Sequence, residues 1–120
     1  MQSFRDLKVW EKGHRLTLEV YEVTAPFPRV ELFGLTSQIR RCCSSIPANI
    51  AEGCGRGTDA DFARFLQVAM GSACELEYHL LLARDLGLLK GSDHERLTRD
   101  VTQVKRMLTS FIQTLKPRNV

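Results

Sequence analysis

Residues 36–56 read TSQIRRCCSSIPANIAEGCGR, and this stretch decides the fold. On a helix that turns about 100° per residue, its apolar residues fall on one side. They form a stripe of Leu35, Ile39, Cys43, Ile46 and Ile50. The opposite side carries only small residues, namely Ser37, Ser44, Ala48 and Ala51. Because small residues let a second helix approach closely, we expect this helix to be buried on both sides.

Pro47 lies in the middle of this helix. Proline lacks an N–H and its ring collides with the preceding turn, so we expect the helix to kink or restart there. Ser44 and Ser45 are placed to hydrogen-bond the carbonyls that Pro47 leaves free. Three glycines at positions 53, 55 and 57 are suited to the C-terminus of the helix.

Upstream of this stretch, the pattern predicts a helix over residues 7–23 that ends before Pro26 and Pro28. It carries two apolar stripes about 120° apart. One consists of Leu7, Trp10, Leu18 and Tyr21, and the other of Val9, Leu16, Val20 and Val23. One stripe faces the subunit core, and the other requires a partner because a row of exposed Val and Leu is unusual on a monomer.

Downstream, two more amphipathic helices are predicted. The third opens at Thr58 with acids in its first turn and stops at Gly87. The fourth opens at Ser92, where Glu95 completes a capping box, and ends before Pro117. Their core positions are Phe62, Phe65, Leu66, Ala69, Ala73, Leu76, Leu80 and Ala83, then Leu97, Val101, Val104, Leu108, Phe111, Ile112 and Leu115. The fold is therefore expected to be all-α, with residues 1–120 as one domain.

Two strings in this order, SIPANIAEGCGR at 45–56 and FARFLQVAMGSACELEYHLLLARDLGLL at 62–89, closely resemble a bacterial four-helix bundle family. Its members were first met as intervening-sequence proteins of large-subunit ribosomal RNA genes, and the resemblance begins at FRDLKVWEKGHRL, residues 4–16. It implies an up-and-down four-helix bundle that assembles into a homopentamer and has no catalytic residues or cofactor. The family also resembles the accessory protein of diversity-generating retroelements, which implies a nucleic-acid enzyme such as a reverse transcriptase as one partner to consider.

The composition is that of a globular protein, with 43% hydrophobic residues in 120. No apolar run approaches the roughly 20 residues that cross a bilayer, and the N-terminus has no apolar signal segment, so a cytoplasmic location is expected. The four cysteines, Cys42, Cys43, Cys54 and Cys74, show no C-x-x-C spacing. Structural thiols are favoured over metal or redox use.

The net charge of +3 is unevenly distributed, because residues 58–90 are net negative and residues 91–120 net positive. On the last helix, Arg96, Arg99 and Arg106 fall within about 80° of one another, away from the core positions, with Lys105 and Lys116 at the boundary. Arg96, Arg99, Lys105 and Arg106 are the candidate nucleic-acid-binding residues, and a merely solvated charged face is the alternative.

Other charged residues are interpreted structurally. His14 is expected to be a partly buried histidine rather than a metal ligand, because no second ligand shares its face at metal-binding spacing. At least one of Arg40 and Arg41 is expected to pair with a carboxylate, with Glu52 on the flank of Arg41. Glu77 is expected to be partly buried with Arg84 as its partner. The Glu-x-x-His spacing of di-iron bundles is missing, and no metal site is predicted.

Three functions follow from these observations. The first is a non-enzymatic oligomer that binds RNA or DNA and docks a nucleic-acid enzyme; the second is a protein-interaction scaffold whose charge serves only solubility. A metal-dependent enzyme ranks last. The subunit interface is predicted at Val9, Leu16 and Val20 of the first helix and at Ser44, Ala48 and Ala51 of the second.

Overall fold

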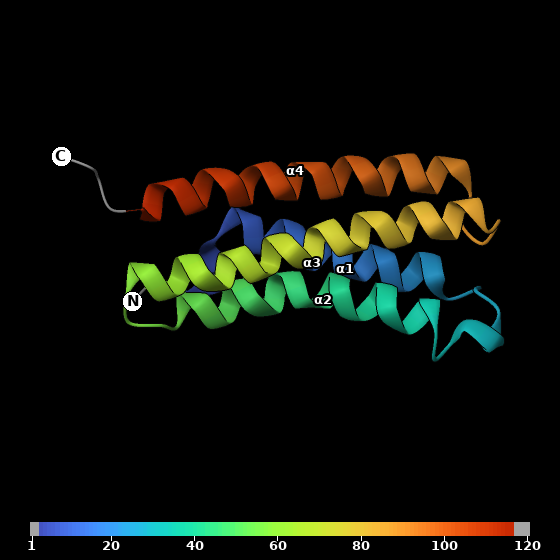
Figure 1. Cartoon of the computed structure of the whole chain (residues 1–120), viewed down its shortest axis with the longest axis horizontal. Coiled ribbons are helices and arrows are strands. Elements are labelled where there is room, and N and C mark those ends of the chain that lie inside the picture. The colour runs from blue at the N-terminus through green and yellow to red at the C-terminus, as the bar shows by residue number, and fades with distance from the viewer. Residues whose placement is uncertain (1–2, 117–120) are drawn as a thin grey trace.

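The computed structural model describes residues 3–116, which form four long helices and two short 3-10 turns (Figure 1). In chain order these are η1 (Phe4–Asp6), α1 (Lys8–Thr24), η2 (Arg29–Glu31), α2 (Leu35–Cys54), α3 (Asp59–Asp85) and α4 (Gly91–Leu115). No strand occurs in this range. The predicted all-α four-helix bundle is confirmed.

The helices run up and down in a rod that extends 52 × 23 × 21 Å. Each helix packs against the next one in the chain, and α4 returns to pack against α1. The packing between α2 and α3 is the most extensive, and that between α1 and α4 the least. The α1–α4 seam is therefore the least closed side of the bundle.

The core is built from the stripes that helical periodicity predicts. Leu35, Ile39, Cys43, Ile46 and Ile50 of α2 are buried, as are the predicted positions of α3 and α4 apart from three at the bundle ends. Those three, Phe62, Phe111 and Leu115, are partly buried and pack against the core. At about 25 cal/mol per Å² of apolar surface removed from water, this burial is the main force that holds the four helices together.

α2 continues through Pro47 without restarting, so the expectation of a restart is wrong, and a kink at this position stays a prediction. The carbonyl of Cys43, four residues earlier, loses the N–H partner that a helix normally provides. The hydroxyl of Thr17 on α1 lies 3.4 Å from that oxygen and 2.8 Å from the carbonyl of Gly13. Partial compensation thus comes from the neighbouring helix, whereas Ser44 and Ser45 bond elsewhere.

The two stripes of α1 have the opposite roles from those we assigned for the subunit interface. Val9, Leu16 and Val20 lie inside the subunit core, at most 4% exposed, so they are not available to join subunits and that part of the prediction is corrected. The stripe that reaches the surface contains Leu18 and Tyr21, which are 58% and 46% exposed. The reason is the close packing at Gly13, where an added Cβ would lie 3.3 Å from Ile46 of α2.

The capping residues predicted from sequence are observed at the helix ends, with one exception. Thr58 caps α3 through a bond from the Asp61 N–H, as predicted. At the other end, Gly87 has a φ of 77°, which permits the paired bonds from its own N–H to Arg84 and from Leu88 to Ala83. α4 begins at Gly91 after Lys90, without a side-chain cap, so the capping box predicted at Ser92 is wrong.

Candidate functional site

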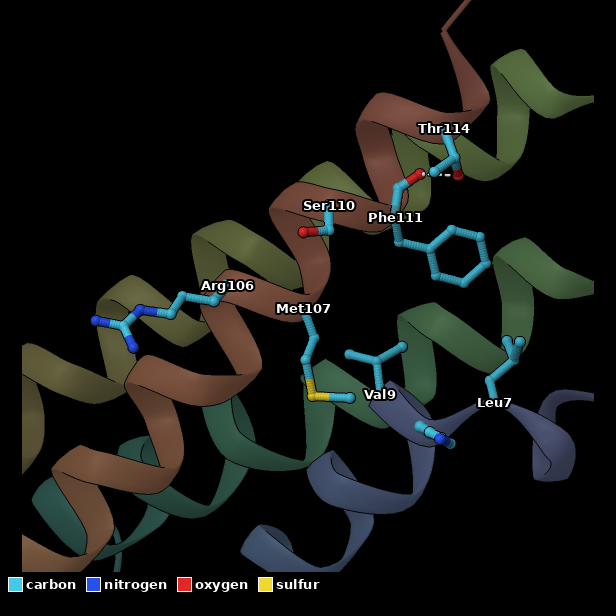
Figure 2. A pocket seen from close by; sticks show the side chains of 8 residues that line it. Leu7, Val9, Arg106, Met107, Ser110, Phe111 and Thr114 are labelled. Carbon is cyan, nitrogen blue, oxygen red and sulfur yellow. Dashed lines mark hydrogen bonds between the residues drawn. The ribbon is translucent and has the colours of Figure 1, made fainter.

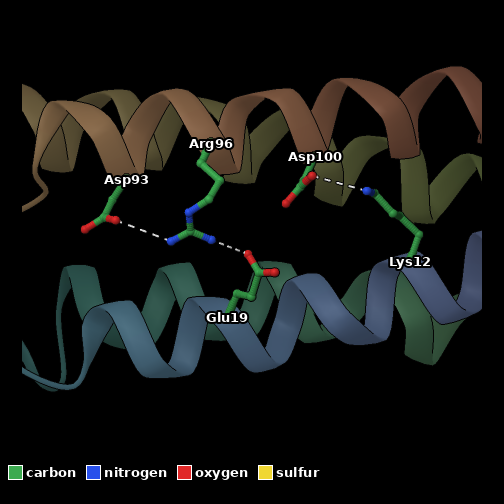
Figure 3. A network of polar contacts seen from close by, with 5 residues as sticks. All are labelled: Lys12, Glu19, Asp93, Arg96 and Asp100. Atoms are coloured by element: carbon green, nitrogen blue, oxygen red, sulfur yellow. Dashed lines mark hydrogen bonds and ion pairs between the residues drawn. The ribbon is translucent and has the colours of Figure 1, made fainter.

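Arg96 lies in the seam between α1 and α4 rather than on an open basic face. Its guanidinium donates to the carboxylate of Glu19 on α1 and, at 3.3 Å, to that of Asp93 one turn earlier (Figure 3). Lys12 of α1 forms a second cross-seam pair, 3.2 Å from Asp100. The charge of Arg96 is therefore already balanced within the subunit.

Lys105 is engaged in the same way on the other flank of α4. Its ammonium lies 2.8 Å from the carboxylate of Glu77 on α3. The hydrogen bond that the Lys105 ammonium donates to the Glu77 carboxylate raises the pKa of Lys105. Two of the four residues predicted to bind nucleic acid thus serve first to join helices.

Of the predicted basic face, Arg99 and Arg106 are the residues that stay accessible to a ligand. Both side chains are exposed, and within residues 3–116 neither forms an ion pair or hydrogen bond. They are seven residues apart, so they lie nearly above one another on the outer side of α4. Lys116 is also exposed at the end of the helix.

The acidic partners differ from those predicted. Glu77 is partly buried as expected, but it pairs with Lys105, while Arg84 pairs with Asp85 at 3.0 Å. Glu52 is exposed and lies 3.4 Å from Arg56, not beside Arg41.

Neither Arg40 nor Arg41 forms an ion pair in the described part of the chain, contrary to the prediction that one of them would. Arg40 instead donates to the Thr24 hydroxyl at 2.9 Å and lies over the ring of Tyr21. It therefore fastens α2 to the end of α1.

His14 is exposed, not partly buried, and its ring stacks on Trp10 with centroids 5.0 Å apart. In the range 3–116, no group of three or more His, Cys, Asp or Glu is arranged to hold a metal ion. None of the helices described is long and apolar enough to cross a membrane.

The cysteines differ sharply in accessibility. Cys42, Cys43 and Cys54 are buried, whereas Cys74 is exposed. Burial raises the pKa of Cys42 to about 12, with a further contribution from Glu75, and raises that of Cys43 to about 11. Since only the thiolate reacts, these two thiols are protected by both burial and protonation.

We expect iodoacetamide at pH 8 to modify Cys74 well before Cys42 and Cys43. A pKa of about 11 leaves roughly one thousandth of the Cys43 thiol ionised at that pH, and reactivity should rise only as the pH approaches that pKa. Peptide mass spectrometry over time reads out each site, with Cys74→Ser as the control that removes the fast phase. Equal rates at Cys42, Cys43 and Cys74 in the folded protein would contradict this assignment.

The small-residue face of α2 lies at the surface. Ala48 is exposed, and Ser44 and Ala51 are partly exposed. Helical geometry places Ser44 and Ala51 toward the flank of α1 that carries Leu18 and Tyr21, because α2 contacts α1 through Arg40, Cys43 and Pro47. We call this surface of Leu18, Tyr21, Ser44, Ala48 and Ala51 the α1–α2 face.

Leu18 and Tyr21 are absent from the interface predicted from sequence, although the sequence around them carries a signal of exposure. The charged residues Glu11, Arg15 and Glu22 lie on their side of α1, and a charged surround is typical of a surface rather than a core.

Fold and surface together define a small helical bundle that exposes an apolar face and, among residues 3–116, cations without an ion-pair partner. A family model described as 23S rRNA-intervening sequence protein matches residues 5–110, and the chain belongs to this family. A solved structure of a protein of unknown function from the S23 ribosomal protein family of Bacteroides thetaiotaomicron is 28% identical, with a TM-score of 0.79. The match covers 88% of this chain and 98% of that one. No curated protein compared with the chain matches it.

Proposed function

We propose that this protein is a non-catalytic, self-associating helical bundle that binds nucleic acid through phosphate contacts. The observation that carries the nucleic-acid part is the exposure of Arg99 and Arg106 on one line of α4, without an acidic partner in residues 3–116. Arginine binds phosphate well because its planar guanidinium offers several donors to the same group. Binding of this kind is electrostatic, tolerant of sequence and sensitive to salt.

Self-association is supported by the α1–α2 face. Leu18 and Tyr21 expose apolar surface on the flank of α1 toward which Ser44 and Ala51 lie, and these small side chains let a second subunit approach closely. A pentamer is the state that the family resemblance implies. Repetition of Arg99 and Arg106 around such a ring creates a positive field that one subunit cannot produce.

A protein-interaction scaffold without nucleic-acid binding is the second candidate. The observation that favours it is the engagement of Arg96 by Glu19 and of Lys105 by Glu77, which leaves a smaller free basic face than the sequence suggests. On this alternative, a nucleic-acid enzyme such as a reverse transcriptase would bind the bundle through protein contacts alone.

The double variant Arg99→Gln/Arg106→Gln is expected to bind single-stranded RNA about tenfold more weakly at low salt, and the slope of log K against log salt should flatten by roughly 0.7 per lost phosphate contact. Gln keeps the helix propensity nearly unchanged, so circular dichroism and oligomeric state should match the parent. Fluorescence anisotropy titrations at several salt concentrations measure the effect.

The matched control is Arg64→Gln/Arg84→Gln, which removes the same charge from α3, where both arginines already pair with Asp61 and Asp85. It should bind RNA nearly as the parent does. Equal loss in both double variants would mean that only net charge matters, and no loss in either would favour the scaffold.

A further inference from the structure

The α1–α4 seam opens into an apolar groove at the end of the bundle where α1 begins and α4 ends. The groove has a volume of about 480 Å³. Figure 2 shows Met107 and Phe111 pointing from α4 toward the side of Leu7 and Val9. Met107 and Phe111 are only partly buried, so the subunit itself does not fill this part of the seam.

Among the residues described, the cations along the seam are paired with acids away from the groove but not at the groove. Farther along, two cations face acids across the seam, in Lys12–Asp100 and Arg96–Glu19 (Figure 3). At the groove, α1 contributes Lys8 and α4 contributes Arg106, and neither has an acidic partner within the described residues. Two exposed cations thus border one apolar surface, and an anionic group placed there would be attracted to both.

We propose that this groove docks an acidic amphipathic helix of a partner protein. Apolar side chains of that helix pack on Met107 and Phe111, and flanking carboxylates pair with Lys8 and Arg106. A neutral or basic partner would leave both cations unpaired beside a desolvated surface, which is costly. Charge complementarity therefore selects an acidic occupant.

The groove has the right length for such a helix. Its α4 wall runs from Arg106 to Thr114, which at 1.5 Å per residue is about 12 Å. The anchor positions i, i+3, i+4 and i+7 of an amphipathic helix span roughly 10.5 Å. Two helical turns of a partner thus match the exposed part of the seam.

The experiment uses a fluorescein-labelled synthetic peptide of about 15 residues, with Leu at i, i+3, i+4 and i+7 and Glu on both flanks, long enough to be partly helical. Anisotropy titrations should give saturable binding to the full chain. The same peptide with Lys in place of Glu should bind at least about tenfold more weakly because it repels Lys8 and Arg106.

Two variants of the protein test the groove itself. Met107→Gln removes apolar contact, and Lys8→Gln/Arg106→Gln removes both charges while leaving the apolar floor in place. Each should weaken binding of the acidic peptide about tenfold, whereas Arg64→Gln/Arg84→Gln on α3 should leave that affinity unchanged.

Different variants test nucleic-acid binding and helix docking, so either proposal can be refuted without the other. Arg99→Gln should weaken RNA binding and leave peptide binding unchanged. Met107→Gln should weaken peptide binding and leave RNA binding unchanged. Lack of saturable peptide binding, or unchanged affinity in both groove variants, overturns the docking site. A change of oligomeric state in Met107→Gln at matched concentration also overturns it, because the groove would then hold a second copy of the chain.

Discussion

Gly53→Ala is expected to lower the free energy of unfolding by about 2 kcal/mol, although alanine is the better helix former. Gly53 lies in the last turn of α2, where α3 packs tightly against it. A Cβ added there would lie 2.8 Å from the Cβ of Phe65 and 3.0 Å from the ring of Phe62. The Cβ of Phe65 is fixed to the backbone, so α3 itself would have to move.

Gly71→Ala is the matched control, since Gly71 lies within α3 and an added Cβ there meets nothing within 4 Å. This change should raise stability by roughly 0.5–1 kcal/mol through helix propensity and reduced freedom of the unfolded chain. Urea unfolding measures both free energies, at one fixed protein concentration so that the proposed association affects both variants equally. Two variants of equal stability would show that α2 and α3 are less closely apposed at Gly53 than the distances indicate.

For the self-association proposed above, Leu18→Arg combined with Ala48→Arg is expected to give a monomer at micromolar concentrations where the parent protein assembles. Both positions belong to the α1–α2 face and are exposed in the subunit, so the added charge costs little in the isolated fold and much in a packed interface. Multi-angle light scattering gives the mass, and circular dichroism checks that the helices persist.

Leu86→Arg provides the control, because Leu86 is 58% exposed, like Leu18, but lies after α3 at one end of the bundle. It should leave the mass unchanged. A parent protein that is already monomeric, or a double variant that still assembles, would refute the α1–α2 face as the interface.

The sequence pattern predicts the structure correctly where the residues of a single helix decide it. The stripe from Leu35 to Ile50 and the stop at Gly87 follow from periodicity and from the conformational freedom of glycine, both of which are local properties.

The sequence pattern gives a wrong prediction where burial or ion pairing depends on the position of a second helix. On α1, only the charges beside Leu18 and Tyr21 distinguish the two apolar stripes in sequence, and the approach of Gly13 to Ile46 shows which stripe enters the core. In the same way, Arg96 lies about 100° from Leu97 on α4, at the edge of the core face, and only the position of α1 shows that Glu19 is within its reach.

The seam between α1 and α4 has a consequence for how the chain folds. The Lys12–Asp100 pair joins residues 88 positions apart, while α2 and α3 are adjacent in the chain and share the most extensive packing. Contacts that close a long loop must first overcome a large loss of chain entropy, whereas contacts between consecutive helices form with little. We therefore expect the α2–α3 hairpin to form first and α1 to dock against α4 last.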